Sequence, residues 1–103
     1  MDISVVIPVF NEESNLLVLH ERLVNVVTSI SNKYELIFVN DGSKDKSLQI
    51  LKELAQKNPQ IKYIDFSKNF GHQLAVFAGL ENAKGDAIVI IDADLQDPPE
   101  LIK

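Results

Sequence analysis

The sequence has no cysteine and few basic residues. The absence of cysteine excludes a disulfide framework and a thiolate metal site, and it is compatible with a reducing compartment. Lysine and arginine number 10 against 15 aspartates and glutamates, so the net charge is −5. Because phosphate backbones recruit basic patches, this balance argues against a nucleic-acid partner.

Long hydrophobic runs are also missing. No apolar run approaches the ~20 residues that a membrane-spanning helix needs, and the opening MDISVVIP begins with an acid where a signal peptide begins with basic residues. We therefore expect no membrane span in these residues and a cytoplasmic location. With 46% hydrophobic residues in 103 positions, the chain can form one domain with an ordinary core.

Strand and helix patterns alternate along the chain. A β-branched run without helical periodicity predicts a strand at 3–10 that is buried on both faces. Further strands are predicted at 34–40, 61–67 and 86–93. Apolar residues at helical spacing predict one helix that follows Asn11 and runs to Ile30, a second over 47–57 and a third over roughly 71–84. This alternation predicts an α/β fold, a Rossmann-like parallel sheet with helices on both faces.

Capping residues set the expected helix ends. Asn11 is a good N-cap for the first helix, Asn58 precedes a proline and so ends the second, and Gly85 suits a left-handed C-terminal cap for the third. The segment DPPE at 97–100 predicts the start of a last helix. Because the chain stops at Lys103, soon after this start, we expect a domain truncated at its C-terminal end.

Polar segments follow all of the predicted strands: PVFNEE, NDGS, SKNFGH and DADLQD. In sheets of this kind, ligands bind at the carboxyl ends of the strands, near the point where strand order reverses. The first turn lacks the G-x-G-x-x-G of dinucleotide-binding proteins, and the phosphate-binding loop G-x-x-x-x-G-K-[ST] is missing from the chain. A phosphotransfer receiver needs an acidic pair after its first strand, and Asn11-Glu12-Glu13 fits this only loosely. The D-x-D of haloacid dehalogenases belongs after a first strand, whereas the D-x-D here follows the fourth.

Asp92 and Asp94 are separated by one residue at the end of the fourth predicted strand. In an extended chain residues i and i+2 point the same way, so the two carboxylates can face one site. They repel each other unless a cation lies beside them, and Mg²⁺ or Mn²⁺ accepts carboxylate and phosphate oxygens together. The amide oxygen of Gln96 could complete the ligand set. The alternative, a solvated acidic turn that caps the next helix, explains Asp97 well and Asp92 poorly.

In this order and spacing, the segments IPVFNEE, FVNDGSKD, SKNFGH and DADLQDPPE resemble the N-terminal half of the family 2 glycosyltransferases, over essentially the whole chain. DADLQDPPE and KNFGH further resemble the branch that transfers a hexose to a polyprenyl phosphate. That branch includes dolichol-phosphate mannose synthases and bacterial undecaprenyl-phosphate glucosyltransferases. The resemblance implies a GT-A fold, in which residues 1–103 form the N-terminal nucleotide-sugar-binding part.

The same resemblance assigns roles to individual residues. The nucleotide-binding residues that it implies are Pro8, Val9, Glu12, Asp41, Lys68, Asn69, Gly71 and Asp92, and the metal ligands are Asp92, Asp94 and Gln96. Asp41 would accept a hydrogen bond from an N–H on the edge of uracil or guanine; the alternative is that it stabilises the turn before Gly42. Lys68 would offset diphosphate charge, with a solvated lysine as the alternative. A histidine at a helix start is more often a polar surface residue than a catalyst, so neither His72 nor His20 is given a role.

The activity that the resemblance implies is transfer of a hexose from UDP- or GDP-hexose with inversion at the anomeric carbon, helped by a divalent metal that neutralises the leaving diphosphate. The expected acceptor is a polyprenyl phosphate, whose anionic oxygen lessens the need for a general base. Any such base is expected beyond Lys103, so this segment alone would bind nucleotide without catalysing. The full-length protein would be membrane-associated on the cytoplasmic face. Two alternatives remain, transfer to a sugar hydroxyl of a polysaccharide and a non-catalytic nucleotide-binding domain.

Overall fold

The computed structural model describes residues 1–94 and Pro99. Within these residues the elements follow one another as β1 (Ile3–Val9), α1 (Leu16–Ile30), β2 (Tyr34–Asn40), α2 (Ser47–Lys57), β3 (Ile61–Asp65), α3 (His72–Asn82) and β4 (Ala87–Ile90). Apart from Pro99, the predicted start of a last helix at 97–100 lies outside the described residues. None of the described helices has the length and apolar character that crossing a membrane requires.

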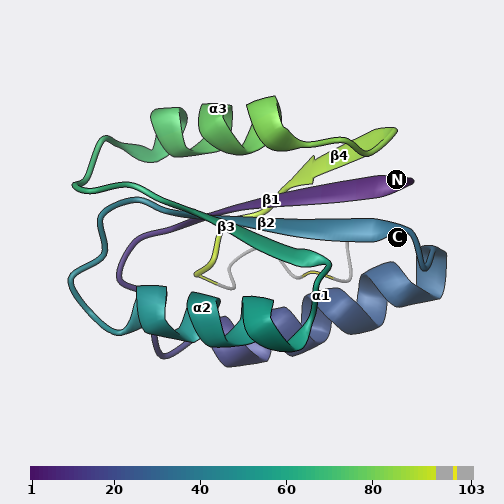
Figure 1. Cartoon of the computed structure of the whole chain (residues 1–103), viewed down its shortest axis with the longest axis horizontal. Helices are drawn as coiled ribbons and strands as arrows, with labels where there is room; N and C mark the ends of the chain where they lie inside the picture. The colour runs from purple at the N-terminus through teal and green to yellow at the C-terminus, as the bar shows by residue number, and fades with distance from the viewer. Residues whose placement is uncertain (95–98, 100–103) are drawn as a thin grey trace.

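The described strands form one parallel sheet in the order β3-β2-β1-β4. Helices α1 and α2 cover one face of this sheet, and α3 covers the other (Figure 1). The predicted α/β fold, a Rossmann-like parallel sheet with helices on both faces, is therefore confirmed. The chain runs outward from β1 to β3, and α3 then returns it to the far side of β1. Strand order thus reverses between β1 and β4, and sheets of this class bind ligands at such a point.

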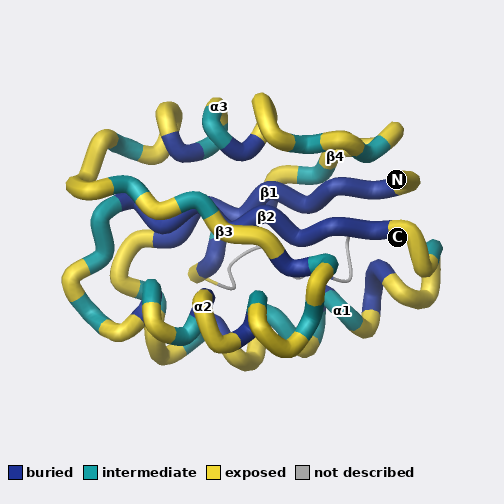
Figure 2. The backbone as a smooth tube through the Cα atoms, in the orientation of Figure 1, coloured by how far each residue is buried: buried dark blue, intermediate teal, exposed yellow. Residues whose placement is uncertain are grey.

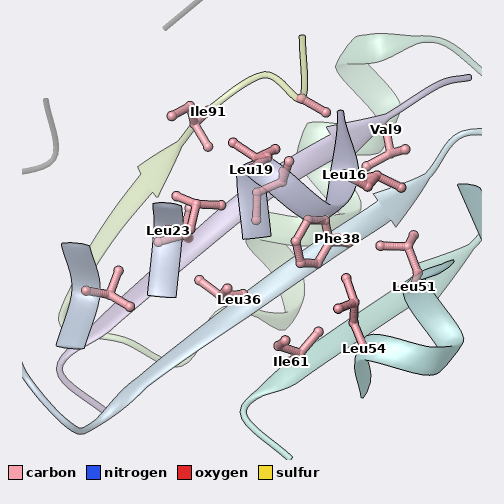
Figure 3. Close-up of a cluster of buried hydrophobic side chains, with 14 of the residues drawn as sticks. Val9, Leu16, Leu19, Leu23, Leu36, Phe38, Leu51, Leu54, Ile61 and Ile91 are labelled. Atoms are coloured by element: carbon pink, nitrogen blue, oxygen red, sulfur yellow. The ribbon is translucent and has the colours of Figure 1, made fainter. Parts of the chain in front are cut away.

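The central strands β1 and β2 are buried along their whole length (Figure 2). The larger apolar cluster lies between the sheet and helices α1 and α2, with Leu19 and Phe38 fully buried in it (Figure 3). A smaller cluster under α3 contains Ile37, Val39 and Ala75. Burying one Leu or Phe side chain contributes roughly 1.5–3 kcal/mol, so the face covered by α1 and α2 supplies most of the hydrophobic stabilisation.

Two predicted helix caps are wrong. Asn11 does not cap α1, because Asn11 has a left-handed backbone with φ 53° and its side chain accepts a hydrogen bond from the backbone N–H of Lys44 over 2.8 Å. Gly85 does not cap α3, which ends at Asn82. A glycine is needed at position 85 for a close approach instead: a Cβ there would lie 2.5 Å from the backbone nitrogen of Ser4 on β1.

The predicted second strand and second helix match β2 and α2 residue for residue. The other elements are shorter than predicted, and β3 stops at Asp65 while β4 stops at Ile90. Strand β4 is also more exposed than its apolar sequence suggests, with Ile88 45% and Ile90 46% accessible. The reason is that β4 pairs, within the described residues, with β1 alone.

A fully buried carboxylate lies at the amino end of the strands. Glu35 accepts hydrogen bonds from the Ser4 hydroxyl over 2.6 Å, from the Lys84 backbone N–H over 2.7 Å and from the Lys62 ammonium over 2.7 Å. Burial alone would raise the pKa of Glu35, but these hydrogen bonds and the charge of Lys62 outweigh burial and hold the pKa below its usual value. The network joins β1, β2, β3 and the connection between α3 and β4.

Candidate functional site

The carboxyl ends of β1, β2 and β4 enclose a pocket of about 300 Å³. It lies where the strand order reverses between β1 and β4. The residues that line it are Pro8, Val9, Phe10, Glu12, Asp41, His72, Asp92, Ala93 and Asp94. Four segments far apart in the sequence therefore meet here, and three of them bring four carboxylates to one pocket.

The loop after β1 is fixed by hydroxyl groups of the loop and helix that follow β2. The backbone N–H of Asn11 donates to the Ser43 hydroxyl over 2.9 Å, and that of Glu12 donates to the Ser47 hydroxyl over 3.0 Å. These N–H groups precede α1 and need acceptors outside it. The two hydroxyls therefore order the loop that carries Glu12 to the pocket wall.

Asp41 follows β2 and is only 4% exposed. Its carboxylate accepts hydrogen bonds from the backbone N–H groups of Phe70 (2.7 Å) and Gly71 (3.1 Å) and from the side-chain amide of Asn69 (3.2 Å). Gly71, the N-cap residue of α3, has no capping side chain. Asp41, which follows β2, therefore supplies the acceptor for the backbone N–H at this helix start. A carboxylate offers about four acceptor positions, so Asp41 can also accept a hydrogen bond from a ligand in the pocket.

Gly42 allows the loop before α3 to approach Asp41 this closely. Its backbone has φ 70°, and a Cβ at this position would lie 2.3 Å from the backbone nitrogen of Asn69. Side chains larger than hydrogen would therefore push residues 68 and 69 away from β2. The close approach keeps the Asn69 amide within 3.2 Å of the Asp41 carbonyl oxygen as well.

A hydrogen bond joins the start of α3 to the D-x-D segment. His72 Nε2 lies 2.8 Å from Asp92 Oδ1, and the two side chains are 61% and 46% exposed. Because an ionised carboxylate only accepts hydrogen bonds, we assign the proton to Nε2. Sequence reasoning gave His72 no role. The available signal was its position in SKNFGH, one of the polar segments that follow the strands.

Asp92 and Asp94 both line the pocket. Their carboxylate oxygens are the ligand type that Mg²⁺ and Mn²⁺ prefer, so the pair fits a hard divalent cation. Gln96, the third predicted ligand, lies outside the described residues. Among residues 1–94 and Pro99, no three side chains of His, Asp or Glu are grouped so that they alone could hold a metal. A Mg²⁺ site commonly takes one or two carboxylates and completes its shell with phosphates and water.

Lys68, Asn69 and Gly71 do not line this pocket, although the sequence predicted a role for each in nucleotide binding. Lys68 and Asn69 lie at a second hollow of about 720 Å³ beside the ends of β2 and β3. The Lys68 ammonium is 5.3 Å from the ring centroid of Phe70, a cation–π distance. Gly71 is connected to the pocket by the hydrogen bond that its backbone N–H donates to Asp41. The sequence analysis also missed Phe10, His72 and Ala93 as lining residues, although each stands next to a predicted one.

The chain matches the family described as "Glycosyl transferase family 2" over residues 4–103. It is 59% identical over 102 residues to the uncharacterized glycosyltransferase YkcC of Bacillus subtilis (strain 168), covering 96% of this chain and 31% of that protein. It is 45% identical over 102 residues to the prophage bactoprenol glucosyl transferase homolog of Escherichia coli (strain K12), covering 99% of this chain and 33% of that protein. The chain thus spans about a third of the length of the curated relatives that it matches.

Solved structures share the arrangement of strands and helices. S. aureus TarS 1-349 in complex with UDP superposes with a TM-score of 0.73 at 26% identity, over 91% of this chain and 28% of that chain. The mannosyltransferase PcManGT from Pyrobaculum calidifontis, in complex with GDP-Man and Mn²⁺, gives a TM-score of 0.72 over 93% of this chain and 32% of that chain. At 23% identity, the likeness to PcManGT concerns the fold alone.

Proposed function

The chain belongs to glycosyl transferase family 2, as its motifs predicted, and on this premise we propose that it binds the donor in an enzyme that moves a hexose from UDP- or GDP-hexose to a polyprenyl phosphate. Residues 1–103 would form the N-terminal nucleotide-sugar-binding part of the glycosyltransferase domain. In the full-length protein, residues outside this segment would supply the sugar and acceptor sites.

One observation carries this proposal. Six residues that the sequence assigned to nucleotide or metal binding line a single pocket at the reversal of strand order, namely Pro8, Val9, Glu12, Asp41, Asp92 and Asp94. A pocket lined by both apolar residues and paired acids suits a ligand that combines a flat base with a metal-bound diphosphate. The UDP complex of TarS, which shares this fold, supports a nucleoside diphosphate as the ligand class.

The proposed acceptor comes from the relatives. Proteins named bactoprenol glucosyl transferase, from Shigella phages SfV and SfX, are 44% and 42% identical to this chain. Bactoprenol is a polyprenol, so these names support a lipid-linked phosphate as the acceptor class. An acceptor of this kind is held in a bilayer, and we therefore propose that the full-length protein works at the cytoplasmic face of a membrane.

The proposed chemistry is a single displacement. An oxygen of the acceptor phosphate forms a bond to the anomeric carbon while the bond from that carbon to the nucleoside diphosphate breaks, so the configuration inverts and the nucleoside diphosphate leaves with the electron pair. Asp92 and Asp94 would hold Mg²⁺ or Mn²⁺, which would neutralise charge on the leaving diphosphate. Asp41 would accept a hydrogen bond from the imide N–H of the base. Since a phosphate oxygen is already anionic, this transfer needs no strong general base.

The test is transfer by the full-length protein. Radiolabelled UDP-glucose and GDP-mannose would each be offered with undecaprenyl phosphate or with an oligosaccharide, in the presence of Mn²⁺ or EDTA. We expect metal-dependent label in the organic phase with one donor, strong loss in Asp94→Ala, and no change in Asp86→Asn, which removes an exposed carboxylate at the other end of the sheet. Label on the oligosaccharide alone would replace the lipid acceptor by a sugar hydroxyl, and nucleotide binding without transfer to either acceptor would favour a non-catalytic domain.

A further inference from the structure

We propose that His72 is a positioning residue for Asp92, holding this carboxylate in the orientation in which the donor nucleotide and its metal meet it. The inference rests on the proposed function, because it concerns how a pocket side chain is ordered before the donor binds. It gives a role to a side chain that the motif analysis left without one. The carrying observation is the contact of 2.8 Å between His72 Nε2 and Asp92 Oδ1 at the wall of the pocket.

The backbone that carries the ring is fixed from two sides. His72 is the first residue of α3, and the N–H of the preceding Gly71 donates to the buried carboxylate of Asp41 over 3.1 Å. One turn further along, Ala75 is fully buried against the sheet, and its N–H donates to the Gly71 carbonyl oxygen over 3.1 Å. The hydrogen bond to Asp41 and the burial of Ala75 therefore hold the start of α3, and with it the backbone of His72, against the sheet.

Asp92 has a fixed backbone but an exposed side chain that needs a partner to hold it in one rotamer. It lies beyond the end of β4, and its neighbours Ile91 and Ala93 are 4% and 3% exposed, so the backbone is anchored. The Asp92 side chain, however, is 46% exposed and would sample several rotamers without a partner. The hydrogen bond from His72 removes this freedom before a ligand arrives and occupies Oδ1, which leaves Oδ2 for the ribose or the metal. Ordering a side chain in advance removes an entropic cost from binding.

The expected effect is a loss of donor affinity when the N–H donor is removed. The hydrogen bond to Asp92 is already present before the ligand binds, so its own strength largely cancels and only the avoided cost of ordering the side chain enters the affinity. Ordering one such side chain costs a factor of about 2 to 12 in an equilibrium. We therefore expect His72→Phe, which keeps a flat ring without the donor, to weaken nucleotide binding about 3- to 10-fold. His72→Gln, whose amide nitrogen can take the place of Nε2, should stay within about twofold of the wild type.

The experiment is calorimetric titration of UDP and GDP into the full-length chain with Mn²⁺, using wild type, His72→Phe and His72→Gln. The second histidine supplies the matched control: His20→Gln alters a half-buried ring on α1, outside the residues that line the pocket. Long-range ¹H–¹⁵N spectra of the ligand-free chain would also report the protonation of Nε2, which the contact requires and which does not depend on nucleotide binding.

Weaker binding by His72→Phe, near-normal binding by His72→Gln and His20→Gln, and a protonated Nε2 are the expected results. Equal or tighter binding by His72→Phe would overturn the inference, as would an unprotonated Nε2 or equal losses in the Phe and Gln variants. If the wild type binds neither nucleotide, the proposed function fails and the inference fails with it. If the wild type binds and His72→Phe binds alike, only the inference fails.

Discussion

The backbone N–H of Phe70 donates to Asp41 Oδ1 over 2.7 Å and joins residues 29 positions apart in the chain. Two positions later, His72 contacts Asp92. Residues 69–72 thus link the end of β2 to the D-x-D segment after β4. A change at Asp41 should consequently alter the position of His72 as well.

Asp41→Ala should destabilise the chain by about 2–4 kcal/mol, because three N–H donors lose a nearly buried acceptor. Asp41→Asn keeps one acceptor oxygen and should cost about half as much. Asp86→Asn, which removes an equal charge at an exposed position far from these donors, should leave stability within about 0.5 kcal/mol. Urea unfolding measures all three. Equal midpoints for Asp41→Ala and the wild type would show that the loop before α3 does not depend on this carboxylate.

Gly79→Ala should destabilise the protein although alanine is the better helix former. In a helix interior the exchange normally gains about 1 kcal/mol, but a Cβ at position 79 would lie 2.3 Å from Val6 Cγ1 on β1. Overpacking of this kind costs about 1–3 kcal/mol, so the net effect should be a loss. In a Val6→Ala background the contact with Cγ1 is gone, and the added methyl group meets only Val39 Cγ2 and the Cβ of residue 6, each at 3.3 Å. The same change should therefore cost clearly less there than in the wild type. A double-mutant cycle in urea measures this coupling, and stabilisation of the wild type by Gly79→Ala would contradict the packing.

The Glu35 network should make stability depend on pH in the acid range. The pKa of Glu35 is lowered from its ordinary value of 4.5, so the folded state binds this proton less readily than the unfolded state. The stabilisation is therefore complete above about pH 4.5 and is lost as the pH falls from there through the lower pKa of the folded state. Glu35→Gln removes the titration and should cost about 3 kcal/mol at pH 7.

The comparison that tests this is the free energy of unfolding of wild type and Glu35→Gln between pH 7 and pH 3. We expect the gap between the two to narrow as the pH falls, because protonated Glu35 comes to resemble the amide. Other carboxylates, such as Asp45, titrate in both proteins. Burial would raise the pKa of Asp45, but hydrogen bonds from Ser47 and Glu13 outweigh burial and lower this pKa. A gap that stays constant or widens toward pH 3 would exclude Glu35 as the source.

The elements that sequence predicted best are those whose signals are local. β2 and α2 match their predicted bounds because a short run of aromatic and aliphatic residues and an Asn-Pro stop each act within a few residues. Asn11 and Gly85 misled for the opposite reason. Each has a local propensity for a cap, but Asn11 is held by Lys44 and Gly85 lies against Ser4, contacts that only the fold creates.

The candidate site shows the same difference between local sequence signals and contacts that only the fold creates. Asp92 and Asp94 were found because they stand at a strand end, and topology brings all such ends to one edge of the sheet. Pro8 was found through the resemblance of its segment to the family motif. The position of Lys68 over Phe70, away from the acids, could not be read from its spacing. The use of Asp41 as an acceptor for the start of α3 depends on a contact across 29 positions, and no pattern in the sequence signals it.

The central claim is that this pocket binds a nucleoside diphosphate through a metal held by Asp92 and Asp94. The most direct measurement is calorimetric titration with UDP and with GDP, with and without Mn²⁺, on the wild type and on Asp94→Ala. We predict binding of one nucleotide that requires Mn²⁺ and is lost in Asp94→Ala, which would also identify the base. Binding that ignores both the metal and the mutation, or no binding of either nucleotide by the full-length chain, would contradict the account.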